Sequence, residues 1–324
     1  MLQLLSHAWK IAQPALTMAR GTPFREVADG VWSLRTAIVN VVFISESDDS
    51  WVLVDAGLGF SAEDILDHAH QLFGDEAPAA IYLTHGHFDH VGALEALLEV
   101  WGEVPVFAHV LELPYITGKS SYPPPDPAVG GGAMSWLSFV YPKGPIDIID
   151  NAEPIPQGEL PGLPGWRVIN TPGHSPGHIS LFRPDDKTLI AGDAFVTTKQ
   201  ESFTAVLLQT EEVNGPPMYF TVDWEQARNS VQALAALKPE TVVTGHGSPM
   251  YGEELRRELD RVAEHFDLFA MPEQGRYVDS PALTDEYGVV EVPPRAKIPF
   301  GTIAVALGLV VAGTAAVVYA RKNR

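Results

Sequence analysis

Apolar and polar positions alternate in short runs along much of the chain. Residues 31 to 54 are rich in Val, Ile, Trp and Phe and are broken by the polar turn SESDDS. Such runs between turn residues are typical of strands, so this segment predicts a hairpin-like meander. Similar runs follow at wider intervals, each ending near Gly, Pro, His or Asp: VPVFAH, WRVINT, HISLFRP, KTLIAGD and TVVTGHG.

Helical periodicity separates these runs. Ser61 suits a helix N-terminus, and Ile65, Leu66, Ala69 and Leu72 after it recur at helical spacing. The same spacing predicts helices in VGALEALLEVWG, DWEQARNSVQALAALKP and GEELRRELDRVAEHFDLF. Strands mixed with helices on a period too irregular for a doubly wound sheet predict an α/β sandwich.

Two long segments have no regular pattern. Residues 114 to 145 combine Pro, Gly and aromatic residues, and residues 199 to 221 follow a Gly-Asp turn. Loops of this length in a compact domain are usually functional or disordered, and their apolar content favours a lid or substrate wall. Residues 272 to 297, rich in Pro and charge, predict a linker.

The end of the chain has a different composition. Residues 298 to 320 contain no charged residue and are long enough for a helix to cross a bilayer, with the basic tail 321 to 324 behind them. We expect a single transmembrane helix here, and a buried core helix is the alternative. Small residues recur every four positions and predict a face for a homodimer: Ala304, Gly308, Ala312 and Ala316.

Charge and composition argue against several kinds of partner and site. The formal net charge of −20 disfavours nucleic acid, which binds clustered Lys and Arg. The chain has no cysteine, which removes disulfides, thiolate nucleophiles and cysteine zinc sites together. Residues 1 to 24 show no basic region before an apolar core, so we expect no signal peptide and a cytoplasmic position for the membrane-anchored domain.

A dense histidine cluster follows the predicted strand IYLT. His85, His87, Asp89 and His90 place four nitrogen or oxygen ligands within six residues, which predicts a metal site. Further candidates lie at the ends of later strands, each beside Gly, where the backbone must crowd close to a shared centre: His174, His178, Asp193 and His246.

The order H-x-H-x-D-H, Gly-His, Gly-Asp and Gly-His-Gly resembles the metallo-β-lactamase fold superfamily, over roughly residues 25 to 265. The resemblance implies a four-layer αββα sandwich as the catalytic domain, residues 25 to 271. It also implies that Asp55, in LVDAGLG, supports the site structurally and that His178 is structural.

The same resemblance implies a division of the ligands between two metals. One metal is expected on His85, His87 and His174. The second is expected on Asp89, His90 and His246. The Asp193 carboxylate would bridge them. Imidazole ligands suit Zn²⁺, so we expect two zinc ions, with Mn²⁺ or Fe as the alternatives.

The function implied is hydrolysis of a small-molecule substrate. A metal-bound hydroxide would attack a small ester, thioester or lactone, with Asp89 orienting the nucleophile or passing a proton. Acyl-homoserine-lactonase activity is one alternative, although Val196 stands where those enzymes carry Tyr and Tyr219 would have to substitute. Glyoxalase II-like activity and a non-catalytic membrane-anchored metal-binding module are the others.

Overall fold

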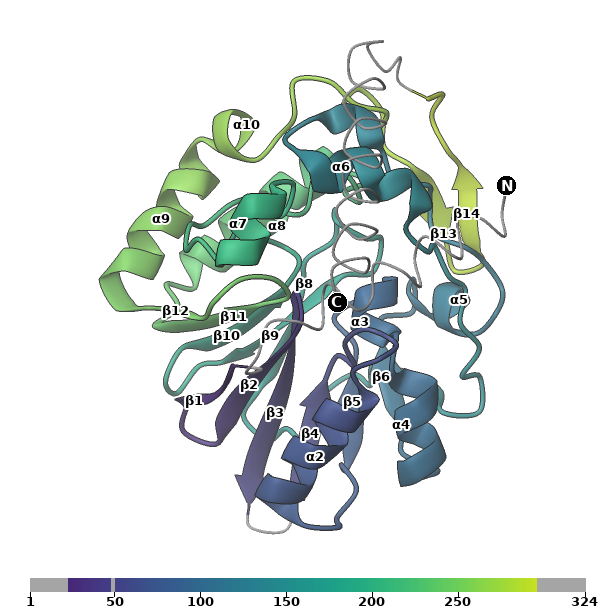
Figure 1. The fold of residues 1–324 in the computed structure, drawn as a ribbon, viewed down its shortest axis with the longest axis vertical. Coiled ribbons are helices and arrows are strands. Elements are labelled where there is room, and N and C mark those ends of the chain that lie inside the picture. Colours follow the sequence, from purple (N-terminus) through teal and green to yellow (C-terminus); the bar gives the residue numbers. More distant parts are fainter. Residues whose placement is uncertain (1–22, 48–49, 296–324) are drawn as a thin grey trace, which may run out of the picture.

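Two β-sheets face each other at the centre of the molecule (Figure 1). The structure is a computed structural model that describes residues 23–47 and 50–295. The larger sheet has seven strands in sequence order: β1 (Phe24–Ala28), β2 (Val31–Thr36), β3 (Val39–Ser47), β4 (Ser50–Val54), β5 (Ala80–Tyr82), β6 (Val106–Ala108) and β7 (Ala152–Pro154). Strands β2 to β4 form the antiparallel meander predicted for residues 31 to 54, and β1, which lies before that segment, pairs antiparallel with β2. Strands β4 to β7 pair in parallel.

The second sheet has five strands. Their spatial order is β12 (Met250–Tyr251), β11 (Thr241–Thr244), β10 (Thr188–Gly192), β9 (Ile179–Arg183) and β8 (Arg167–Asn170). Only β10 and β11 run parallel, with Leu189 opposite Val242. Each of these strands except β12 corresponds to a run expected from the sequence.

Alternate side chains of the strands fill different layers of the core. In β3, Val42 and Ile44 face the second sheet, whereas Val41 and Phe43 face the helices outside the first sheet. All four side chains are buried. A strand covered on both faces is apolar at successive positions, which explains the run VVFI in the sequence.

Helices cover the outer face of each sheet. Against the larger sheet lie α2 (Ala62–Phe73) and α4 (Leu94–Trp101). Against the smaller sheet lie α8 (Trp224–Ala236) and α9 (Gly252–Glu264), followed by α10 (Phe266–Phe269). The order of layers is therefore helices, sheet, sheet, helices, and the expected αββα sandwich is confirmed (Figure 1).

The two segments without periodicity contain short helices. Residues 114 to 145 include most of α5 (Leu113–Ile116), the 3₁₀ turns η1 (Pro127–Val129) and η2 (Ser138–Val140), and α6 (Ala133–Leu137). Residues 199 to 221 include α7 (Phe203–Leu208), whose N-cap Ser202 accepts a hydrogen bond from Ala205 N–H. The two segments touch, because Met134 N–H donates to the Glu201 carbonyl.

Residues 272–295 differ from the linker expected there. They contain β13 (Leu283–Asp285) and β14 (Gly288–Glu291), which pair with each other. Tyr277 is buried and donates a hydrogen bond to the Pro124 carbonyl, and Ala282 packs into the core beneath α8. Packing against the domain thus continues past residue 271, and this stretch is not a free linker.

The expected membrane helix, residues 298–320, lies outside the described residues, as do residues 1–22 and the basic tail. Within residues 23–47 and 50–295, no helix has the length and apolar character needed to cross a bilayer.

Candidate metal centre

The expected ligands lie at the ends of strands from both sheets. His85 and His87 follow β5, with Asp89 and His90 in the short helix α3 (Phe88–Val91). Asp193 follows β10 directly and His246 follows β11 by one residue. Because β10 and β11 are parallel, their carboxyl ends meet at one edge of the sheet. His174 reaches the same place from the loop between β8 and β9.

The glycines beside these residues are required by close packing. A Cβ atom on Gly245 would overlap the Asp193 carboxylate and would lie 2.7 Å from the His90 ring. A Cβ atom on Gly192 would lie 2.7 Å from His178 Nε2, and the backbone there has φ +53°. The expectation that glycine lets the backbone crowd a shared centre is confirmed at both positions.

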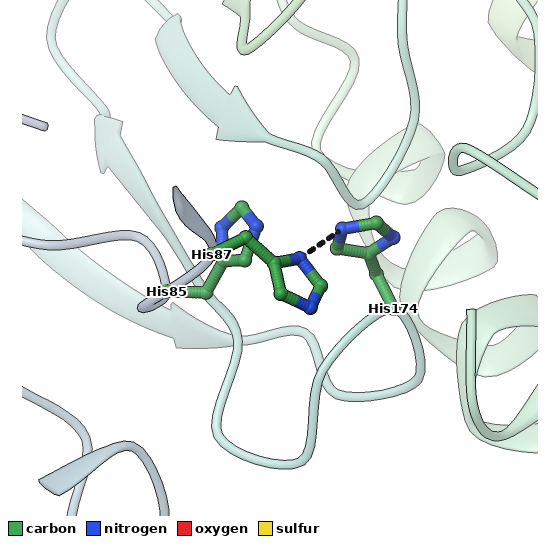
Figure 2. A group of neighbouring side chains, drawn as sticks. All are labelled: His85, His87 and His174. Carbon is green, nitrogen blue, oxygen red and sulfur yellow. Dashed lines mark hydrogen bonds between the residues drawn. The ribbon is translucent and has the colours of Figure 1, made fainter. Parts of the chain in front are cut away.

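The side chains form three overlapping groups, and within each group the possible ligand atoms lie within 4.8 Å of one another. One group is His85, His87 and His174 (Figure 2). A second is Asp89, His90 and His246, and the third is His85, His90 and Asp193. The first two correspond to the two expected ligand sets. Asp193 joins one member of each set.

Several polar atoms in the cluster are buried without a hydrogen-bond partner among the residues the structure describes. They are His85 Nε2, His90 Nε2 and Asp193 Oδ1. A buried polar atom without a partner costs free energy, about 1–3 kcal/mol. Three such atoms converging in one cluster fit divalent cations, because imidazole nitrogens and carboxylate oxygens are the ligands that Zn²⁺ and Fe accept.

Hydrogen bonds from the far side of two rings orient them toward the centre. His90 Nδ1 lies 2.8 Å from Asp55 Oδ2, and His246 Nδ1 lies 2.7 Å from the Ile38 carbonyl. An Nδ1–H that donates to an oxygen leaves Nε2 with its lone pair free for a metal. Asp55, the expected structural support, also accepts hydrogen bonds from Thr84 N–H and Oγ1–H, each at 2.8 Å.

Asp193 occupies the middle of the cluster. Its Oδ2 atom lies 3.2 Å from His246 Nε2, 3.5 Å from His174 Nε2 and 3.6 Å from His90 Nε2. Burial alone would raise the pKa of this carboxyl, but His246 and His90 lower it well below its usual range. A carboxylate that stays ionised among imidazoles has the charge and position needed to contact two cations.

Burial controls the charge of the histidines in the first group. Burial lowers the pKa of His174 to about 4. It also lowers the pKa of His85 well below the ordinary value, with neighbouring imidazoles adding to the effect. The imidazoles are therefore neutral at pH 7, which is the form that binds metal. His87 Nδ1 and His174 Nε2 lie 3.0 Å apart (Figure 2).

His178 belongs to none of the three groups. Its Nε2 accepts a hydrogen bond from Asp193 N–H at 2.9 Å, and its Nδ1 lies 2.8 Å from Thr171 Oγ1. The ring therefore holds the backbone of Asp193. This position agrees with the structural role expected for His178.

Aromatic side chains border the cluster on the side of residues 114 to 145 and 199 to 221, the two lid segments expected from the sequence. The Phe220 ring stacks on His87, with ring centroids 4.4 Å apart, and Tyr141 and Phe88 pack near it. Tyr219 is buried in the same apolar group. Burial raises the pKa of the Tyr219 phenol, and the charges of nearby Asp89 and Asp193 raise it further. Tyr141, Tyr219 and Phe220 belong to residues 114 to 145 and 199 to 221, the segments in which the sequence predicts a lid or substrate wall.

Some residues of the site carry no sequence signal. Glu112 is fully buried and lies beside the loops that hold His87 and His174, yet it stands alone in HVLELP. Tyr122 lies within a segment expected to be a lid, but nothing in the sequence places its ring 4.4 Å from that of His87. Only contacts between distant parts of the chain reveal these two residues.

Fold and cluster together define an α/β sandwich with a buried histidine and aspartate centre for divalent metal ions. A family model, the metallo-β-lactamase superfamily, matches residues 34–246. The chain belongs to this superfamily, whose members are metal-dependent hydrolases that bind divalent metals. The expected family membership and the expectation of a dinuclear metal cofactor are thus confirmed.

Several known proteins are similar to this chain in sequence or in fold. The chain is 47% identical over 252 residues to the probable metallo-hydrolase YflN of Bacillus subtilis (strain 168), covering 76% of this chain and 95% of that protein. It is 29% identical over 200 residues to a hydroxyacylglutathione hydrolase of Pectobacterium carotovorum subsp. carotovorum (strain PC1), covering 62% and 58%. The solved structure of a B3 metallo-β-lactamase with an active-site glutamic acid has a TM-score of 0.54 at 17% identity, covering 79% and 92%. That last likeness concerns the fold alone.

Proposed function

We propose that this protein is a dinuclear metal-dependent hydrolase of a small ester, thioester or lactone. The observation that carries the proposal is the pair of ligand groups, each with ligand atoms within 4.8 Å of one another, with Asp193 between them. His85, His87 and His174 would hold one cation, and Asp89, His90 and His246 the other. Two zinc ions fit this donor set best, because five of the seven donors are imidazoles.

The bound cations would supply a water-derived nucleophile at neutral pH and polarise the electrophilic carbon of the substrate. The chain supplies the positioning. Asp55 and the Ile38 carbonyl fix the rings of His90 and His246, and the His178 ring fixes the backbone of Asp193. No serine or cysteine nucleophile is needed for this chemistry.

Asp89 is the proposed proton carrier. It is buried in the first turn of α3, and its Oδ2 atom lies 3.4 Å from His246 Nε2. Burial raises the pKa of the Asp89 carboxyl, which makes it a better proton acceptor than a solvated aspartate. We assign Asp89 the task of orienting the nucleophile and moving its proton.

The wall beside the cluster supports a small substrate with an apolar part. Phe220, Tyr219 and Tyr141 border the group of His87, and none of them carries a charge at neutral pH. A hydroxyacyl-glutathione thioester, suggested by the Pectobacterium relative, would need basic partners for its carboxylates. The lid segments contain three lysines, Lys119, Lys143 and Lys199, which are isolated from one another in the sequence, and this favours simpler esters and lactones.

A panel of substrates tests the proposal. Zinc-loaded protein is assayed against phenyl esters, acyl thioesters, a hydroxyacyl-glutathione and lactones that include acyl-homoserine lactones. We expect turnover of at least one class, lost in Asp193→Asn and kept in Asp126→Asn. Asp126 is a buried aspartate outside the cluster, and among the described residues its carboxylate accepts from the backbone N–H groups of Ala128 and Arg276. Two bound metals with no turnover across the panel would instead support a non-catalytic metal-binding module.

Residues 298–320 form the second part of the proposal. Their uncharged, apolar composition supports a membrane anchor, with the catalytic domain on the cytoplasmic side and the small-residue face available for a homodimer. An apolar substrate that concentrates in lipid would suit an anchored enzyme. Partition of the full chain and of a chain ending at residue 297 between membrane and aqueous fractions tests this part.

A further inference from the structure

A buried glutamate outside the metal cluster connects the two loops that carry the histidines of the first group. Glu112 is the N-cap residue of α5 and is fully buried. Its Oε2 atom accepts hydrogen bonds from Gly86 N–H, at 3.1 Å, and from the Tyr122 hydroxyl. Its Oε1 atom accepts from Ser175 Oγ–H at 2.8 Å and from Gly177 N–H at 2.7 Å.

Three of these four donors belong to the loops of the metal ligands, and the fourth, the Tyr122 hydroxyl, comes from residues 114 to 145. Gly86 lies between His85 and His87, and Ser175 directly follows His174. One carboxylate group therefore joins the loop after β5 to the loop between β8 and β9. The backbone joins the same two segments at one point, where Ile179 N–H donates to the Thr84 carbonyl at 2.9 Å. The Glu112 carboxylate adds a second link, in which Oε2 accepts from Gly86 N–H on one side and Oε1 accepts from Ser175 Oγ–H and Gly177 N–H on the other.

The side chains around Glu112 are closely packed. A Cβ atom on Gly86 would lie 2.7 Å from the Tyr122 hydroxyl, and one on Gly177 would lie 3.0 Å from Glu112 Cγ. The Tyr122 ring lies between His87, at 4.4 Å, and Tyr115, at 3.8 Å, measured between ring centroids. A shift of the Glu112 carboxylate would therefore displace Tyr122, and with it the neighbouring ring of His87.

If Glu112 only stabilised the fold, it would not need to be a charged side chain. Burying a carboxylate is costly unless several donors compensate it, and an apolar side chain of similar volume would serve packing as well. All four partners of Glu112 are donors, which suits the ionised acceptor-only form. Burial raises the pKa of Glu112, while the hydrogen bonds from Tyr122, Gly177 and Ser175 act in the opposite direction.

We infer that Glu112 is a positioning residue that sets the separation of His87 and His174, and thereby the affinity of the metal site they share with His85. The inference rests on the proposed function only in requiring that these histidines bind a metal. The contrast with the other site is sharp. His90 and His246 are oriented by Asp55 and by the Ile38 carbonyl. Among the described residues, the side-chain hydrogen bonds of Glu112 go to Gly86, Tyr122, Ser175 and Gly177 instead.

Stepwise zinc titration of the metal-free full chain, against a chromophoric chelator, measures the two sites separately. Glu112→Gln keeps the shape but replaces one acceptor oxygen by a donor, so one loop loses its contacts. We expect one of the two zinc ions to bind about 10–100-fold more weakly, and the other to keep its affinity. Asp126→Asn is the matched control and should change neither affinity, because the buried Asp126 carboxylate accepts from the backbone N–H groups of Ala128 and Arg276, outside the cluster.

The outcomes separate this inference from the proposed function. Wild-type protein that binds no zinc refutes both. If the wild type has two zinc sites and folded Glu112→Gln binds zinc at both with unchanged affinity, the role of Glu112 is overturned and the proposed function is not. An equal loss of affinity at both sites also overturns that role, because it would show that Glu112 stabilises the whole site. If Glu112→Gln does not fold, the same zinc titration is made with Tyr122→Phe. It removes one donor to Oε2, and a zinc affinity equal to wild type at both sites would overturn the inference.

Discussion

Replacement of Asp55 tests the hydrogen bonds behind the metal cluster. Its carboxylate accepts from three buried donors at 2.8 Å: Thr84 N–H, Thr84 Oγ1–H and His90 Nδ1–H. Its backbone has φ +60°, a region that aspartate tolerates better than alanine. Asp55→Ala removes every acceptor and adds backbone strain.

The expected magnitude follows from the donors left without a partner. The Thr84 hydroxyl can turn to His85 Nδ1, 3.1 Å away, so two buried donors remain, the Thr84 N–H and His90 Nδ1–H. At about 1–3 kcal/mol each, they give a loss of about 4 kcal/mol in the free energy of unfolding. The left-handed backbone adds about 1 kcal/mol for alanine. The midpoint of thermal unfolding should fall by about 10–20 °C in a domain of this size.

Urea and thermal denaturation followed by circular dichroism measure this loss. The metal-free protein is used, so that metal affinity does not enter the result. Asp223→Ala is the control, because Asp223 also accepts a backbone N–H as the N-cap of α8 but lies outside the cluster, and its loss should cost about 1 kcal/mol. A loss in Asp55→Ala no larger than in Asp223→Ala would refute the assigned role of Asp55.

Three further changes have definite expected results. His87→Ala should lower zinc content by about one ion per chain and abolish turnover, as measured by elemental analysis and the substrate panel; normal activity would contradict the ligand assignment. Removal of residues 298–324 should leave an active domain that needs no detergent, and an unfolded product in circular dichroism would mean that the segment belongs to the core. Gly173→Ala places a Cβ atom against the Ala227 backbone at φ +131° and should unfold at much lower urea than Gly74→Ala, where the space is open; equal midpoints would contradict the packing.

The longer strands and helices were predictable because each carries its own pattern. β3 shows a continuous apolar run, and α2 shows helical spacing, so both are recognisable without the rest of the chain. The metal cluster was predictable for a related reason. His85, His87, Asp89 and His90 adjoin one another in sequence, and the remaining candidates sit beside glycines at strand ends.

Glu112 and the end of the domain were not predictable in the same way. The partners of Glu112 include Gly177, 65 residues away, and no local pattern indicates such a contact. Residues 272–295 have the composition of a linker, since Pro and charge dominate them. Their attachment depends on a few side chains, such as Tyr277, that pack against distant residues.

Anomalous X-ray diffraction at the zinc edge, on crystals of the zinc-loaded protein, tests the central claim most directly. We predict two peaks per chain, one among His85, His87 and His174 and the other among Asp89, His90 and His246, with the Asp193 carboxylate in contact with both. A single peak, or two peaks away from these side chains, would contradict the dinuclear centre on which the proposed hydrolase depends.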